Sequence, residues 1–76
     1  MVTLQELKNI CSKKLEQYTK EKNEQKIKTF TLIQQMLEYE DALKKLGPEI
    51  CFNIFYDLGF DKKQATQIYA DLVLKQ

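Results

Sequence analysis

The scarcity of glycine and proline is the feature that most restricts what this chain can fold into. Its 76 residues include two glycines and one proline, at positions 47, 59 and 48. Few turns can therefore be built, and no long stretch alternates apolar and polar residues as a half-buried strand does. Apolar residues instead recur every three or four positions, the spacing of a helical face. The sequence predicts an all-α fold, a small helical bundle that forms one domain over residues 1–76.

The N-terminal part is expected to form a long helical hairpin over residues 3–46. Thr3 and Glu6 have the spacing of a capping box, so the first helix should begin there. A stretch without apolar residues follows, and we expect the chain to break at 20–23; the alternative is one long helix that crosses this solvated stretch. Asn23 is suited to cap a second helix, which should continue to residue 46. Its apolar positions are spread too widely for one stripe, so this helix should pack against two or more neighbours.

The C-terminal part is expected to form a short helix pair over residues 48–75, joined at Gly59. Gly47 should end the second helix and Pro48 should begin the third, since glycine commonly follows a helix and proline commonly starts one. Asp61, with a glutamine three positions later, has the pattern of a second capping box. The last helix should start there and run to the C-terminus.

Composition argues against catalysis and against a metal site. The chain has no histidine, so Cys11 and Cys51 lack an imidazole base, and both stand among apolar neighbours where a thiol is unreactive. Without histidine a structural zinc site needs four cysteines or carboxylates. Two glycines cannot build a known phosphate-binding loop. We therefore expect no enzyme, no catalytic residue, no cofactor and no metal.

The expected setting is the cytoplasm. The N-terminal residues lack the apolar core of a signal peptide. No apolar run approaches the roughly 20 residues that a membrane helix needs, so no membrane association is expected. Two cysteines without an obvious pairing pattern are typical of a reducing compartment.

Aromatic residues are concentrated in the third helix and around it. That helix is apolar on almost every side, and a bundle of this size cannot easily cover all of it. Exposed apolar surface of this kind marks interaction sites, although the helix could also be the centre of the core. The expected contact surface is made by aromatic side chains: Tyr39, Phe52, Phe55, Tyr56 and Tyr69.

These features predict a non-enzymatic protein-binding module, such as a small adaptor, accessory subunit or inhibitor. Its protein partner is not identified by the sequence. A homodimer is expected, because self-association would bury the surplus apolar surface. The net charge of +1 implies that salt should affect binding only modestly.

The corner at Gly59 also resembles a DNA-binding helix-turn-helix, and this gives an alternative function. Apolar residues stand at the positions that such a motif buries: Ile54, Leu58, Phe60, Ala65 and Ile68. Phe55, however, stands where the motif prefers alanine. In this alternative, a transcriptional regulator would place its 61–75 helix in the major groove. The groove-facing residues would be Lys62, Lys63, Thr66 and Gln67. All twelve basic residues are lysines, and lysine lacks the planar fork with which arginine reads guanine.

The same corner resembles part of the ubiquitin-associated module. The matching pattern is Leu58-Gly59-Phe60-Asp61, then Ala65, then Ile68-Tyr69. It covers the first two helices of that module, and the resemblance implies a ubiquitin-binding function. The sequence ends before the module's third helix could form, so ubiquitin is not the partner that we expect.

Overall fold

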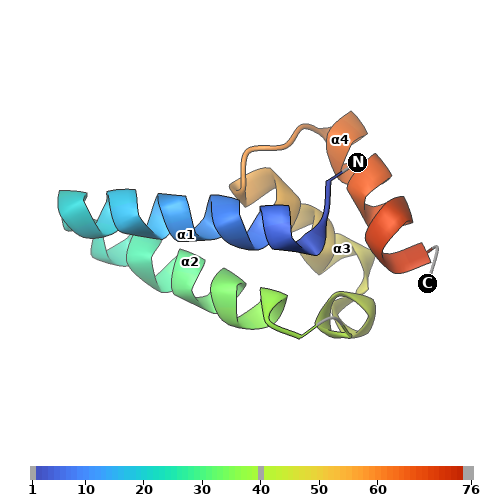
Figure 1. Cartoon of the computed structure of the whole chain (residues 1–76), viewed down its shortest axis with the longest axis horizontal. Helices are drawn as coiled ribbons and strands as arrows, with labels where there is room; N and C mark the ends of the chain where they lie inside the picture. The colour runs from blue at the N-terminus through green and yellow to red at the C-terminus, as the bar shows by residue number, and fades with distance from the viewer. Residues whose placement is uncertain (1, 40, 75–76) are drawn as a thin grey trace.

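The computed structural model describes residues 2–39 and 41–74, and its regular elements are all helices (Figure 1). They are α1 (Leu4–Glu21), α2 (Glu24–Leu37), α3 (Ala42–Asp57), α4 (Lys62–Tyr69) and a π-helical turn, η1 (Ala70–Leu74). The all-α prediction is confirmed. The predicted end of the last helix at residue 75 lies outside the described residues.

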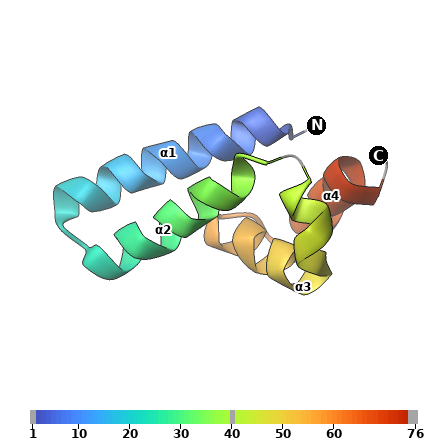
Figure 2. The same cartoon turned by 90° about the horizontal axis from the view of Figure 1, so that it is seen from below.

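Helices α1 and α2 form an antiparallel hairpin whose turn projects beyond the rest of the molecule, while α3 and α4 pack at the other end (Figures 1 and 2). The side chain of Thr3 accepts a hydrogen bond from the Glu6 amide and so caps α1. Between the two helices, the ring centroids of Tyr18 and Phe30 lie 5.3 Å apart. The Cys11 thiol donates a hydrogen bond to the Phe30 carbonyl.

The hairpin turn is fixed by two caps that follow each other directly. The Lys22 amide donates to the Thr19 carbonyl, and the Asn23 amide donates to the Tyr18 carbonyl. This pair of bonds is the Schellman motif that commonly ends helices. Lys22 adopts the left-handed conformation (φ 56°) that the motif demands and that glycine usually provides. Asn23 then caps α2 by accepting from the Lys26 amide, as predicted.

The second helix ends at Leu37, so the prediction that it continues to residue 46 is wrong. On one continuous helix, Leu37 and Leu43 would point about 120° apart, because each residue turns the helix by about 100°. The break lets both side chains enter the core, where both are buried. Helix α2 nevertheless contacts both α1 and α3, as its wide apolar surface predicted.

Helix α3 is interrupted at Gly47, whose φ of 83° and ψ of 168° are not helical. Pro48 follows directly, so the predicted stop and start occur at these two residues, although the helical region begins earlier, at Ala42. The thiol of Cys51 donates to the Leu43 carbonyl at 3.0 Å. This bond links the two halves of α3 across the interruption.

The corner between α3 and α4 repeats the hairpin turn, with glycine in place of lysine. The Gly59 amide donates to the Tyr56 carbonyl and the Phe60 amide donates to the Phe55 carbonyl, which is again the Schellman pattern. Two residues later Asp61 and Gln64 form a complete capping box, with bonds of 2.8 and 3.0 Å. Both caps were predicted from the sequence.

The core draws side chains from every α-helix. Its buried apolar members are Leu7, Cys11, Phe30, Ile33, Leu37, Leu43, Cys51, Ile54, Phe55, Leu58, Ala65 and Ile68.

Beyond α4 the chain continues as the π-helical turn, whereas a plain α-helix was expected. The buried Asp71 in this turn accepts a hydrogen bond from the Gln67 side chain at 3.0 Å.

The two matching turns yield a paired stability test. Replacing Lys22 with glycine removes the steric cost of a lysine in the left-handed conformation. The free energy of unfolding should therefore rise by about 0.5–1 kcal/mol. Replacing Gly59 with alanine introduces a larger cost, because its φ of 106° lies beyond the left-handed helical region, and should lower stability by more than about 1 kcal/mol although no atom obstructs a Cβ there. Urea denaturation followed by circular dichroism measures both. A destabilised Lys22→Gly variant would show that the turn does not restrain Lys22 as described.

Candidate protein-contact surface

Three of the predicted aromatic residues meet on one side of α3 and α4. The centroid of the Phe52 ring lies 5.6 Å from the centroid of the Tyr69 ring and 6.1 Å from that of the Tyr56 ring. Both pairs have an edge-to-face arrangement. Tyr56 is 41% exposed, and Phe52 and Tyr69 are half-buried. We call this group, Phe52, Tyr56 and Tyr69, the α3–α4 aromatic surface.

Local structure explains how these rings come together. Phe52 and Tyr56 are four residues apart on α3, so they lie on one helical face. The capped corner turns the chain, and the burial of Ala65 and Ile68 sets which side of α4 faces the core. Tyr69 is thereby placed beside that face and against Phe52. Edge-on ring pairs at these distances are favourable beyond the area they bury.

Phe55 does not belong to this surface, so its expected role in contacting a partner is corrected. Its side chain is fully buried, and it is the largest of the fully buried side chains. Its ring lies 6.5 Å from that of Phe52. Phe55 therefore packs beneath Phe52 in the core, and it has no exposed area with which to contact a partner.

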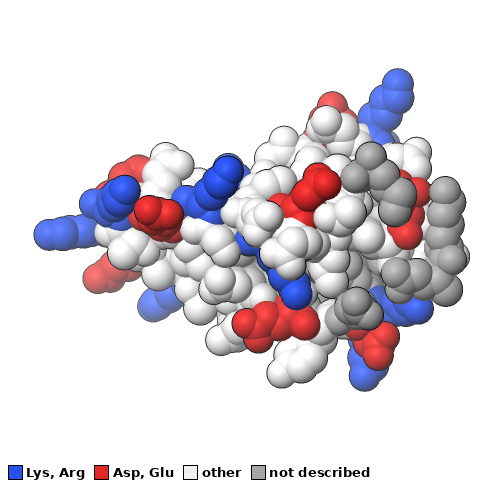
Figure 3. Space-filling model, in the orientation of Figure 1, with Lys and Arg blue, Asp and Glu red and all other residues white. Residues whose placement is uncertain are grey.

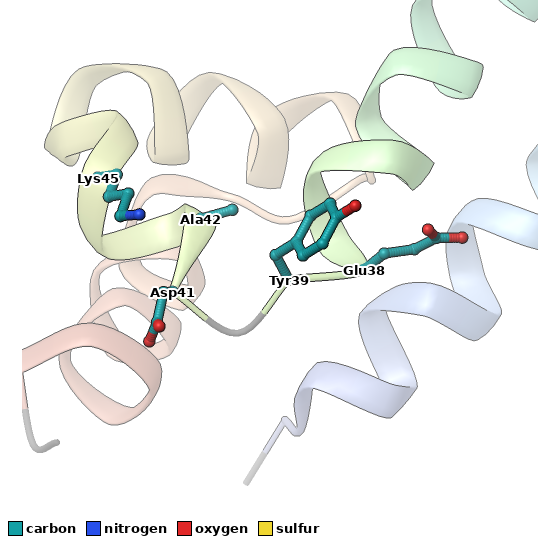
Figure 4. Close-up of a pocket in the computed structure, with 5 residues that line it drawn as sticks. All are labelled: Glu38, Tyr39, Asp41, Ala42 and Lys45. Atoms are coloured by element: carbon teal, nitrogen blue, oxygen red, sulfur yellow. The ribbon is translucent and has the colours of Figure 1, made fainter.

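Tyr39 lies apart from the aromatic surface, in the connection between α2 and α3. It is 69% exposed and lines an open hollow of about 500 Å³ together with Glu38, Asp41, Ala42 and Lys45 (Figure 4). The figure shows the Asp41 carboxylate and the Tyr39 ring pointing in different directions. The described residues that line this hollow include no other predicted contact residue, so Tyr39 lies apart from the rest of them.

The four residues of the DNA-binding alternative all lie exposed on α4. The Thr66 hydroxyl donates to the Lys62 carbonyl of its own helix, and the Gln67 amide is held by Asp71. Asp61 precedes Lys62 and Lys63 directly, so a carboxylate offsets part of their charge. The face is polar and accessible, but it is not strongly positive.

The two thiols are structural groups. Cys11 and Cys51 are both buried and free, and each donates to a backbone carbonyl, at 3.3 and 3.0 Å. Burial raises the pKa of both thiols, because a thiolate is poorly solvated in the core. Both sulfurs are thereby held in the protonated form, which is a poor nucleophile.

On α2 and α3, two large exposed apolar side chains were not singled out from the sequence as contact residues. Leu32 on α2 is 56% exposed, and it borders an open apolar hollow of about 340 Å³ with Ile27, Lys28 and Thr31. Ile50 on α3 is also exposed. Each belongs to a helix that is apolar on more than one side, so the sequence signals surplus apolar area without showing which residue carries it.

Comparison of the chain with known protein families, with characterised proteins and with solved structures finds no match. In the part of the chain that the structure describes, no helix combines the length and the apolarity needed to cross a membrane. What the aromatic surface does is therefore inferred from its own side chains.

The division between core and surface predicts two contrasting substitutions. Phe55→Ala should lower the free energy of unfolding by about 3–5 kcal/mol, because it leaves a cavity in the core. That loss is a large part of the roughly 4–11 kcal/mol expected for a chain of this length. Tyr56→Ala should cost less than about 1.5 kcal/mol, mostly from the lost ring contact.

Guanidinium denaturation checks both values. Because Phe55→Ala can leave the chain unfolded, Phe55→Leu serves as a milder variant and should still cost more than Tyr56→Ala. Equal losses at positions 55 and 56 would contradict the assignment of Phe55 to the core.

Proposed function

We propose that the protein is a non-enzymatic protein-binding module that acts through the α3–α4 aromatic surface. The observation that carries this proposal is the contact of three aromatic rings from two helices, with Tyr56 partly open to solvent. Tyrosine and phenylalanine are enriched at the centres of protein interfaces and supply a large share of their binding energy.

The arrangement favours binding because little order has to be gained. Phe52 and Tyr69 already restrain each other, and Phe52 is supported by the buried Phe55. Side chains held in place before binding lose little conformational entropy when a partner arrives. Each tyrosine also carries a hydroxyl that can donate or accept a hydrogen bond at the edge of a contact.

The partner that we propose first is a second copy of the chain. In a two-fold dimer the same patch meets itself, so a surface of mixed apolar rings and hydroxyls can be self-complementary. The net charge of +1 gives little repulsion between copies. Figure 3 shows lysines and acids mixed at the hairpin end, and charges of both signs scattered among uncharged residues over the rest of that face.

The dimer is expected to be weak. A standard interface takes about 800 Å² from each partner, which is more than three half-buried rings supply. Flanking residues of α3 and α4 must therefore contribute.

Binding to a different protein, as an adaptor, accessory subunit or inhibitor, would use the same rings. We place this activity in the cytoplasm, since two unpaired thiols are usual in a reducing compartment.

The alternative is a DNA-binding regulator that uses α4. Its support is that Lys62, Lys63, Thr66 and Gln67 are exposed on one helix that follows a tight turn, while Ala65 and Ile68 anchor that helix in the core. The neighbouring carboxylates and the absence of arginine make it the second choice.

Static light scattering over a range of concentrations tests the self-association. The mean molar mass should rise above the 9.0 kDa of one chain towards twice that value. Tyr56→Ala should hold the mass at that of the monomer without loss of helical circular dichroism. Tyr39→Ala, which removes an exposed tyrosine elsewhere, is the matched control and should behave like the unmodified chain. A mass that stays at 9.0 kDa at millimolar concentration would exclude the homodimer.

Fluorescence anisotropy with labelled duplex DNA separates the two functions. If the protein-binding proposal is right, the duplex shows no tight binding at physiological salt. The variant with both Lys62→Ala and Lys63→Ala should then keep the self-association of the unmodified chain. A DNA-binding regulator would instead bind with an affinity that falls steeply with salt, and the double substitution would weaken it further. That result would overturn the proposal.

A further inference from the structure

We draw no further inference here: the strongest candidate, the apolar hollow that Ile27, Lys28, Thr31 and Leu32 line on the exposed side of α2, carries none because nothing in the structure shows what covers it.

Discussion

The capped corner between α3 and α4 is the constraint on which the candidate surface depends. A Schellman motif at Gly59 ends α3, and a complete capping box at Asp61 starts α4 almost at once. Only eight residues long, α4 would be marginal alone, since isolated helices shorter than about 12–15 residues are rarely stable in water. The corner and the burial of Ala65 and Ile68 therefore hold Tyr69 against Phe52.

Helix α3 contributes side chains both to the core and to the exposed surface. Its inner side, which includes Ile54 and Phe55, is buried, whereas Tyr56 and Ile50 remain exposed on other sides. The burial of Ile54 and Phe55 supports the alternative that places this helix at the centre of the core, whereas its role as an interaction site stays a prediction. One side forms the centre of the core, and the remaining apolar area is the surplus that a small bundle cannot cover.

Caps and turns could be predicted from the sequence because they depend on residues close together in the chain. Thr3, Asn23 and Asp61 cap the helices that they were expected to cap, and Gly59 ends α3. The end of α2 at Leu37 could not be predicted in this way. It depends on contacts between distant helices, and no glycine or proline marks it.

The candidate site was predictable only in part, for the same reason. The sequence analysis grouped Phe52, Phe55 and Tyr56 together, because they stand in a helix that is apolar almost all round. Which of these rings is buried depends on where the neighbouring helices pack, and helical periodicity alone does not contain that information. Tyr39 was grouped with them by residue type, and the break after α2 places it elsewhere.

The central claim is that the chain associates with a second copy of itself through Phe52, Tyr56 and Tyr69. A dilution series followed by two-dimensional NMR of the isotope-labelled protein tests it most directly. The account predicts concentration-dependent shifts at these three residues and their neighbours on α3 and α4, with the hairpin end unchanged. Shifts confined to Tyr39 or to the Leu32 side of α2, or the absence of any shift, would contradict it.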